Sequence, residues 1–302
     1  MDESDPTPDQ SIYFCERTGK GKYTEIGSQT FLENLRGDLN QQIILYIHGF
    51  NNMPEPDVFP RAEALQKLFN DAAAASKEDI SYEVVVLLWP CDASLGMARK
   101  YWDDQKSSEM SSFGFSRMLE RFMDWRSENN GTCFRPINIL AHSMGNRVLR
   151  LTLKNWANDK GMLPALFRNI FMVAPDVANE TLEKGNSGYF ITQAARNVAV
   201  YYANDDLAMS ASKVANLKNR VATRRLGHTG PERMDKVSDN VYAIDCDNVN
   251  NKYDRPKGHS YFLKTNGTKG SPGVVFKHIF NSCETGRIKC DPVTRRWELK
   301  KK

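Results

Sequence analysis

The chain has 302 residues, of which 40% are hydrophobic and 26% charged, with a formal net charge of +4. This length and composition suffice for one sizeable core, so we predict a single domain over residues 1–302. No apolar run approaches the ~20 residues that a membrane-spanning helix needs. The six cysteines are scattered without a CxxC pair, which excludes the ligand spacing of a zinc site and predicts free thiols.

The two ends of the chain are polar and differ in charge. Residues 1–10, MDESDPTPDQ, lack the basic and apolar regions of a signal peptide, which predicts a cytoplasmic protein with a flexible N-terminus. Residues 285–302 form a basic tail, which we interpret as a solvated segment. Contact of this tail with an anionic membrane surface is the alternative, whereas no helical or aromatic pattern favours nucleic acid as a partner. The sequence predicts no oligomeric state.

The first predicted elements in chain order are short. Ile12–Cys15 is predicted to form an edge strand, and Thr30–Glu33 has the spacing of a capping box at the start of a short helix. Six apolar runs follow, each short, non-alternating and rich in β-branched or aromatic residues, as is typical of strands covered on both faces. They are Ile43–Ile47, Val84–Leu88, Ile137–Leu140, Ile170–Ala174, Val198–Ala203 and Val241–Ile244.

Helical patterns separate these runs. Apolar residues recur at helical spacing in Arg61–Ala75, Phe115–Ser127 and Asn146–Trp156. Strands that alternate with helices form βαβ units with right-handed crossovers. The sequence therefore predicts an α/β fold with a doubly wound, mostly parallel sheet flanked by helices. Pro90–Ser112 and Leu207–Asn240 are less regular, and we interpret them as short lid insertions or pocket walls.

The most informative local pattern is the segment INILAHSMGN around Ser143. A buried strand leads directly into a tight turn and then a helix, which is the context of a nucleophile elbow. Such a turn requires small residues two positions before and after the serine, and Ala141 and Gly145 occupy these positions. We therefore expect the Ser143 hydroxyl above the sheet at a helix N-terminus, where the backbone N–H of Met144 faces a developing oxyanion.

A second pattern, HGFNN, directly follows the predicted strand Ile43–Ile47. Gly49 lets the backbone turn sharply, and the N–H of Phe50 is the predicted second donor to the oxyanion. One such donor typically contributes ~3 kcal/mol to transition-state stabilisation. His48 is interpreted as a support for this loop, with a role as catalytic base as the less favoured alternative.

Several segments along the chain stand out together. They are YIHGFNN, LLWP, LAHSMGNRVL, MVAPDV, YYANDDLAMS and GHSYF, of which LAHSMGNR and GHSY are the most specific. In this combination they resemble a family of bacterial α/β hydrolases of unknown function (DUF900), over roughly Ile12 to Phe280. The resemblance implies an α/β-hydrolase fold and a Ser-Asp-His triad in that chain order, and it implies little about the substrate.

The general base is expected among the histidines that follow Ser143. His259 lies in a loop after the predicted strand Val241–Ile244, which is the expected position of the base. His228 lies in an arginine-rich loop with no strand before it, and His278 lies inside a helical run. His259 is therefore the favoured base, with the other two as alternatives.

The acid is expected between the serine and the histidine, directly after a strand. Val198–Ala203 leads into Asp205 and Asp206, of which only one can face an imidazole. The resemblance selects Asp206, because the family has an Asp-x-Ala-Leu block that matches the residues from Asp206 onwards. Asp205 and Asp176 remain alternatives, although Asp176 is more simply read as a turn or N-cap residue.

These residues predict a serine hydrolase that cleaves an ester-type bond, such as a carboxylic ester, thioester or lactone, in a small molecule or lipid. Ser143 would attack the carbonyl, His259 would take its proton, and Asp206 would hold the imidazole while an acyl-enzyme forms and is hydrolysed. No metal, nucleotide or redox cofactor is expected, since no P-loop, GxGxxG or ligand spacing occurs.

Trp89, Tyr101 and Trp102 are the candidate residues of the substrate pocket, because they follow a strand end and favour an apolar acyl or aryl group. Two alternative functions differ in class from a soluble esterase. One is a non-catalytic binding module that keeps the elbow for structural reasons. The other is a membrane-associated lipase anchored by the basic tail.

Overall fold

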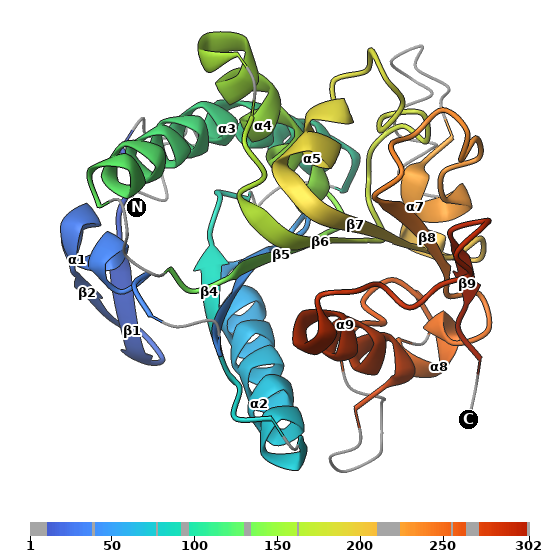
Figure 1. Cartoon of the computed structure of the whole chain (residues 1–302), viewed down its shortest axis with the longest axis horizontal. Coiled ribbons are helices and arrows are strands. Elements are labelled where there is room, and N and C mark those ends of the chain that lie inside the picture. Colours follow the sequence, from blue (N-terminus) through green and yellow to red (C-terminus); the bar gives the residue numbers. More distant parts are fainter. Residues whose placement is uncertain are drawn as a thin grey trace.

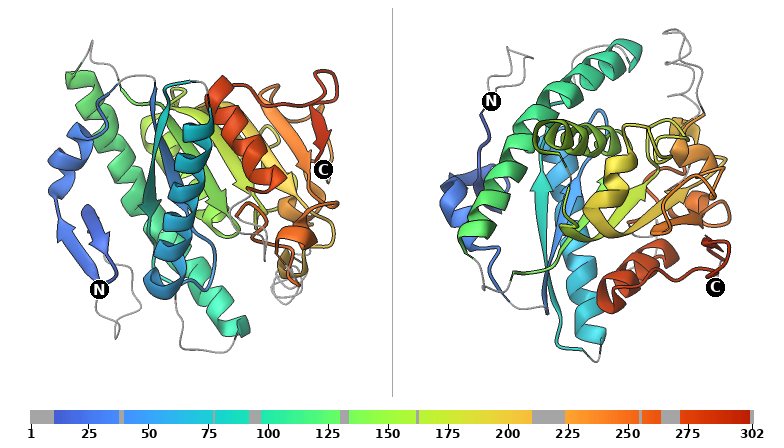
Figure 2. Two further views of the ribbon diagram at one scale, coloured as in Figure 1. Left: turned by 90° about the horizontal axis from the view of Figure 1, so that it is seen from below. Right: turned by 45° about the horizontal axis from the view of Figure 1, so that its top comes forward.

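The structure is a computed structural model, which describes residues 11–37, 40–76, 78–91, 97–129, 134–161, 163–209, 224–254, 256–263 and 272–300, with the backbone alone at 97–100. The predicted flexible segment 1–10, Cys133 and part of Leu207–Asn240 lie outside these residues. One sheet lies between two layers of helices (Figure 1), and the turned views of Figure 2 show the same layers.

The main sheet has seven strands in the order β4-β3-β5-β6-β7-β8-β9, and every neighbouring pair is parallel. Its first six strands in chain order correspond to the six predicted apolar runs, with ends that differ by a few residues. They are β3 (Gln41–Ile47), β4 (Ser81–Leu87), β5 (Ile137–His142), β6 (Phe167–Val173), β7 (Ala195–Tyr202) and β8 (Val241–Asp245). The predicted doubly wound parallel sheet is confirmed.

Helices bury their apolar sides against both faces of this sheet. The core on one face includes residues of α3 (Met97–Glu128), α4 (Gly145–Lys160) and α5 (Tyr189–Ala194). The core on the other face includes residues of α2 (Phe59–Ala75), α8 (Asn250–Tyr253) and α9 (Val274–Thr285). Since both faces are covered, the strands need not alternate apolar with polar residues, which is what the sequence shows.

The chain reverses its direction of winding between β3 and β5. After β3 it passes through α2 to β4, and it then returns through α3 to β5, on the opposite side of β3. Ligands of open parallel sheets bind where the strand order reverses, outside the carboxyl ends of the strands. At this point the loop that begins at His48 and the turn at Ser143 lie side by side.

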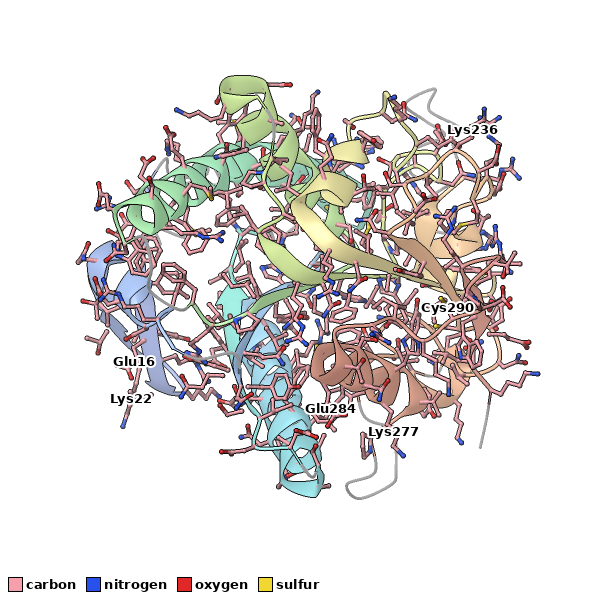
Figure 3. All side chains as sticks on the ribbon, in the orientation of Figure 1. Glu16, Lys22, Lys236, Lys277, Glu284 and Cys290 are labelled. Atoms are coloured by element: carbon pink, nitrogen blue, oxygen red, sulfur yellow. The ribbon has the colours of Figure 1, made fainter. Side chains whose placement is uncertain are left out.

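The N-terminal hairpin corrects a prediction. Ile12–Cys15 is not an edge strand of the main sheet: β1 (Cys15–Gly19) and β2 (Lys22–Glu25) form a separate antiparallel pair. The two strands are mostly exposed and polar on both faces, so they offer no apolar face for a second layer. Figure 3 shows the hairpin residues Glu16 and Lys22 at the edge of the molecule.

The predicted capping box is also wrong. Helix α1 spans Gly27–Glu33, with Ile26 as its N-cap and no side-chain cap. Thr30 therefore lies inside the helix, and its carbonyl accepts a hydrogen bond from the N–H of Asn34 at 3.1 Å. The left-handed φ of +69° at Gly27 allows the chain to enter the helix four residues earlier than the capping box would.

Most of Pro90–Ser112, which we read as a lid insertion, is the first half of α3. The missing signal is apolar periodicity, because Asp104, Ser108 and Ser112 occupy the buried face at spacings of four residues. Each of the two serines satisfies its hydroxyl within the helix, by donating to the carbonyl of Gln105 or Glu109 at 2.6 Å. A helix whose buried face is polar escapes a search for apolar stripes.

The C-terminal segment is not the solvated tail that the charge pattern indicated. Strand β9 (Arg296–Glu298) pairs with β8 at the edge of the sheet, and Leu299 is buried. Arg295 donates to the carbonyl of Ser238 at 2.6 Å, and Arg296 donates to that of Pro231 at 2.7 Å. These arginines are therefore bound by backbone carbonyls of the chain.

The described cysteines are free, as predicted: Cys15, Cys91, Cys246, Cys283 and Cys290.

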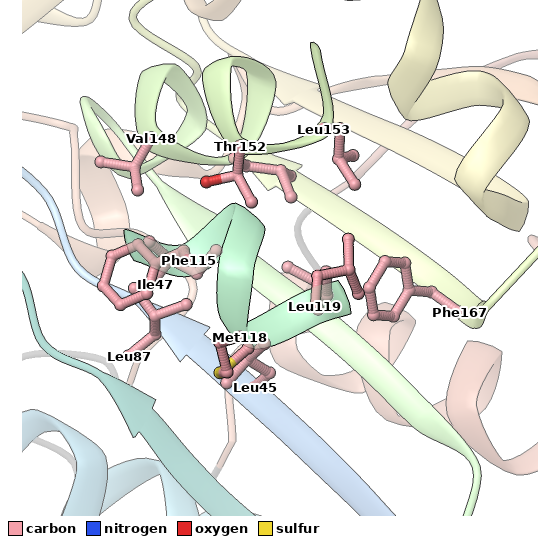
Figure 4. A pocket seen from close by; sticks show the side chains of 12 residues that line it. Leu45, Ile47, Leu87, Phe115, Met118, Leu119, Val148, Thr152, Leu153 and Phe167 are labelled. Carbon is pink, nitrogen blue, oxygen red and sulfur yellow. The ribbon is translucent and has the colours of Figure 1, made fainter. Parts of the chain in front are cut away.

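A small cavity lies between α3, α4 and the sheet (Figure 4). Its volume is about 30 Å³, which gives room for a water molecule or two. Thr152 contributes the only hydroxyl among lining side chains that are otherwise hydrocarbon or thioether, so this cavity is a packing defect rather than a reaction site. Among the described residues, no helix has the length and hydropathy needed to cross a bilayer.

Candidate active site

The turn between β5 and α4 holds Ser143 in a strained conformation. Ser143 has a left-handed φ of +54°, which is uncommon for a residue with a side chain. Its N–H donates to the carbonyl of Val173 at 3.0 Å, and its carbonyl accepts from the N–H groups of Asn146 at 3.1 Å and Asp176 at 3.2 Å. The backbone of the serine is therefore fixed from both sides, as a nucleophile elbow requires.

Close backbone contacts explain the small residues of the turn. A Cβ on Gly145 would lie 2.5 Å from the carbonyl oxygen of Ile47 and 2.6 Å from that of His48. A Cβ on Gly49 would lie 2.9 Å from the Cβ of Ser143. Glycine at these two positions thus lets the loop after β3 and the elbow after β5 touch, a contact between loops that adds to the tight turn expected from the sequence.

The predicted acid and the predicted base are hydrogen-bonded to each other. The His259 Nδ1–H lies 2.7 Å from Oδ2 of Asp206, a carboxylate with no exposed surface. The other oxygen, Oδ1, accepts from the N–H groups of Ala208 at 2.9 Å and Met209 at 3.0 Å. Since the proton then resides on Nδ1, Nε2 of His259 is left with the lone pair that a general base needs.

One set of contacts shapes the His259 loop internally, and another holds it against the elbow. Oδ2 of Asp254 accepts from the N–H groups of His259 at 2.8 Å and Ser260 at 2.6 Å. His142, the residue before Ser143, has its Nε2 3.2 Å from the carbonyl oxygen of His259, and the two rings are 4.6 Å apart. Burial and then the nearby His259 hold the pKa of His142 well below its usual value, so His142 is a neutral donor.

The alternatives to this pair lie elsewhere. Asp205 accepts from the side-chain amides of Asn250 and Asn251. His278 is buried on α9, between the hydroxyl of Tyr201 at 2.8 Å and the carbonyl of Lys289 at 2.9 Å. His228 lies on the short helix α7 (Leu226–Thr229). Among the described residues, Asp206 and His259 are the only aspartate and histidine whose side chains are hydrogen-bonded to each other.

His48 supports the loop after β3. Its Nδ1–H donates to the carbonyl of Gly49 at 2.9 Å, while Nε2 accepts from the N–H of Trp89 at 3.2 Å. The indole N–H of Trp89 returns a hydrogen bond to the His48 carbonyl at 2.9 Å, and the two rings are stacked. Burial lowers the pKa of His48 to about 4. Both of its nitrogens are occupied, which leaves it no lone pair for proton transfer.

These contacts give Trp89, which is 1% exposed, a packing role rather than a contact with substrate. Trp102 is half-buried and packs against the core of the α3–α4 face. Tyr101 is also buried, and its ring meets that of Phe50 edge-on at 5.5 Å. Of the three predicted pocket residues, Tyr101 is the one whose ring meets that of Phe50, the residue of the predicted oxyanion donor.

Helix α3 clamps this loop at a second point. The fully buried carboxylate of Asp104 accepts from the N–H of Asn51 at 3.1 Å, one residue after Phe50. The amide of Asn52 reaches back to the carbonyls of Gly49 and Phe50, each at 2.9 Å. The direction of the Phe50 N–H is therefore set by contacts on both sides of it in the chain.

A buried ion pair lies next to the elbow. Oδ1 of Asp176 lies 3.3 Å from Nε of Arg225, and Oδ2 accepts from the hydroxyl of Tyr101 at 2.7 Å. Asp176 was an alternative for the triad acid, and its carboxylate faces an arginine and a tyrosine instead of a histidine.

Sequence reasoning missed several residues of this site. Asn146 donates from its amide to the carbonyls of Ala141 at 2.8 Å and Ser143 at 3.2 Å, and so ties the elbow together. Its position directly after Gly145, in a helix whose buried side otherwise has Thr152 as its one polar side chain, was an available signal. Asp104 and Asp254 had no comparable signal, because each is one acid among many in a polar stretch.

The parallel sheet, the strained serine at its switch point and the Asp206–His259 pair define the chain as an α/β hydrolase in fold. Residues 25–271 match the model of a family described as "Alpha/beta hydrolase of unknown function (DUF900)", and the chain belongs to this family. The resemblance stated from the sequence is thereby confirmed. No curated protein matches the chain.

Two similar solved structures are of phospholipase PlaB from Legionella pneumophila. The structure in complex with thio-NAD has 12% identity and a TM-score of 0.29, and covers 68% of this chain and 37% of that chain. The other has 11% identity and a TM-score of 0.31, and covers 76% of this chain and 42% of that chain. The chain thus spans less than half of the phospholipase, and similarity at this level assigns no activity.

Proposed function

We propose that the protein is a serine hydrolase that cleaves an ester-type bond through an acyl-enzyme on Ser143. The observation that carries the proposal is the 2.7 Å hydrogen bond between Asp206 and His259, in a loop packed against the residue before a serine with a φ of +54°. A buried carboxylate that holds one nitrogen of an imidazole is the arrangement that prepares the other nitrogen to accept a proton.

The first half of the reaction forms the acyl-enzyme. Oγ of Ser143 attacks the carbonyl carbon while Nε2 of His259 takes its proton, and Asp206 stabilises the imidazolium. The N–H groups of Phe50 and Met144 donate to the oxyanion. The bond from carbon to the leaving oxygen then breaks, and the imidazolium returns its proton to the departing alcohol.

The second half regenerates the serine. Water attacks the acyl carbon as His259 removes one of its protons, the bond from carbon to Oγ breaks, and that proton passes to Oγ. The products are a carboxylic acid and the free enzyme, so the cycle needs no cofactor for its atom balance.

A screen of p-nitrophenyl esters of increasing acyl length tests this proposal, with wild type, Ser143→Ala and Ser260→Ala compared side by side. Ser260 is the matched control, a serine in the same site region whose role in the loop is carried by its backbone N–H. We expect turnover by the wild type and by Ser260→Ala, and none by Ser143→Ala. Equal turnover by wild type and Ser143→Ala would overturn the proposal.

A further inference from the structure

Three arginines gather on one side of the elbow. Arg147 and Arg150 lie four and seven residues after Ser143, so α4 carries them on the side that faces away from its apolar stripe. Arg225, at the N-cap of α7, lies close enough to Arg150 for their charges to interact. We call Arg147, Arg150 and Arg225 the arginine cluster.

Among the described residues, the carboxylates paired with the arginine cluster do not balance its charge. Arg225 pairs with Asp176, and Arg147 pairs with Glu109, so two anions face three cations. Arg150 donates to the hydroxyl of Ser187 at 2.8 Å, and within the described ranges no carboxylate lies within ion-pair distance of it. Burial, with Arg147 and Arg225 close by, lowers the pKa of Arg150 to about 10. One positive charge is therefore left over in a largely desolvated place.

Donors of the arginine cluster are also left over. The Nε atoms of Arg147 and Arg150 are buried, and neither makes a hydrogen bond to any residue that the structure describes. Buried donors are nearly always paired, so adjacent unpaired ones call for an acceptor. The planar guanidinium suits carboxylate and phosphate oxygens best.

The arginine cluster is connected to the nucleophile through backbone and side chain. The N–H of Asp176 donates to the carbonyl of Ser143 at 3.2 Å, and the carboxylate of the same residue holds Arg225. Seven residues of helix place Arg150 roughly 10 Å along the axis from Ser143. An anionic group at Arg150 would thus lie within the length of one small ester bound at the serine.

A groove continues from the arginine cluster. It has a volume of about 280 Å³ and is lined by Lys154, Gly185, Asn186, Ser187, Tyr189 and Phe190. Ser187 joins the two features, because its hydroxyl both accepts from Arg150 and lines the groove. Lys154 lies one helical turn beyond Arg150 on α4 and adds a cation to the three of the arginine cluster. Tyr189 and Phe190 add apolar surface to the groove.

We propose that the arginine cluster and this groove bind an anionic group, a carboxylate or a phosphate, carried by the substrate of Ser143. The inference rests on the proposed function, since it names the class of ester that the same serine would cleave. One unbalanced charge and a set of unpaired guanidinium donors are matched by one anionic group at the far end of the ester.

Matched esters test the proposal. On the acyl side, p-nitrophenyl octanoate is compared with the mono-p-nitrophenyl ester of suberic acid, which replaces the terminal methyl by a carboxylate. On the alcohol side, octyl acetate is compared with 8-acetoxyoctanoate. We expect wild type to have at least a ten-fold higher kcat/KM for the anionic member of one pair. Arg150→Gln should remove this preference and leave the neutral ester within two-fold.

Arg121→Gln is the matched control, because Arg121 is an exposed arginine on α3. It should leave both kcat/KM values unchanged. Arg150→Lys keeps the charge and should retain part of the preference, and it stands in for Arg150→Gln if that variant does not fold. No preference for either anionic ester, or an equal loss on both members of a pair in Arg150→Gln, would overturn the inference.

A measurement without turnover separates this inference from the proposed function. Inorganic phosphate should raise the Tm of wild type above its value in chloride of equal ionic strength, and it should not do so in Arg150→Gln. Stabilisation by phosphate with no ester cleavage would refute the proposed function and, with it, the substrate subsite, and would leave the cluster as an anion site that serves no ester of Ser143. Phosphate binding in an active esterase that has no anionic preference would assign the cluster to free phosphate and refute the substrate subsite.

Discussion

Two neighbouring loops beside Ser143 each bury an aspartate, and the two aspartates differ in partner rather than in burial. The loop after β6 carries Asp176, which is 4% exposed, and the loop after β7 carries Asp206, which is 0% exposed. Asp206 faces the imidazole of His259, whose second nitrogen has a lone pair for a proton, whereas Asp176 faces the guanidinium of Arg225, which has donors only. The comparison teaches that the partner of a buried carboxylate, and not its burial, indicates whether it can serve a proton transfer.

Exchanging each aspartate for asparagine sharpens this comparison most. Asp206→Asn keeps the shape but removes the charge that fixes the tautomer and stabilises the imidazolium of His259, so we expect kcat to fall about 10³–10⁴-fold. Asp176→Asn should lower kcat for a neutral ester less than ten-fold. Because it leaves the buried Arg225 without its carboxylate, it should instead cost about 3 kcal/mol of unfolding free energy.

Steady-state kinetics and urea unfolding of both variants check this pair of outcomes. Ser260→Ala serves as the control for handling, with kcat changed by less than two-fold and the unfolding free energy by less than about 0.5 kcal/mol. If Asp176→Asn lost activity as deeply as Asp206→Asn while remaining folded, the division of roles between the two loops would be wrong.

The loop after β3 extends the comparison to a third buried aspartate. Asp104→Ala removes the acceptor for the Asn51 N–H and frees the backbone that carries the Phe50 N–H, so we expect kcat to fall about 10–100-fold with KM unchanged within two-fold. Asp104→Asn retains an acceptor oxygen and should recover most of this loss. A fall of equal size in both variants, or a change confined to KM, would contradict a positioning role.

Buried neutral histidine makes stability depend on pH. The pKa of His48 is about 4 in the folded protein, against 6.5 for an unperturbed histidine. As the pH falls, the imidazole of residue 48 is therefore protonated in the unfolded chain before it is protonated in the folded one. The stability that the neutral His48 contributes is complete above pH 6.5 and is lost as the pH falls toward 4. We expect roughly 2 kcal/mol less stability at pH 5 than at pH 7 from this group. Urea unfolding should show that the free energy of unfolding differs less between pH 7 and pH 5 in His48→Asn than in wild type. If this difference is the same in both proteins, His48 is not a buried neutral histidine.

The smallest expected effect concerns Tyr101. Tyr101→Phe deletes the hydroxyl that donates to Asp176 at 2.7 Å and keeps the ring that contacts Phe50. We expect a loss of about 1–2 kcal/mol in unfolding free energy and less than a three-fold change in kcat. Tyr23→Phe, an exposed tyrosine on the hairpin, is the control. A large loss of kcat would show that Tyr101 acts on substrate rather than on the loop that carries Asp176.

The sequence was informative where one physical requirement dominated. Strands covered on both faces must be apolar, so all six runs were found, and the tight turn at Ser143 must have small neighbours, so the elbow was found. It was uninformative where stability comes from distant partners. Asp104, Ser108 and Ser112 form a polar buried face of α3. The short strand Arg296–Glu298 forms because it can pair with the free edge of β8. Asp176 was recognised as a candidate, but its partner Arg225 is forty-nine positions away and no local pattern joins them.

Reaction with a fluorophosphonate probe, followed by peptide mass spectrometry, tests whether Ser143 is a nucleophile that His259 activates. We expect a single phosphonylated site at Ser143, with labelling slowed by orders of magnitude in His259→Gln and absent in Ser143→Ala. Folded wild-type protein that stays unlabelled, or that is labelled equally fast in His259→Gln, would contradict it.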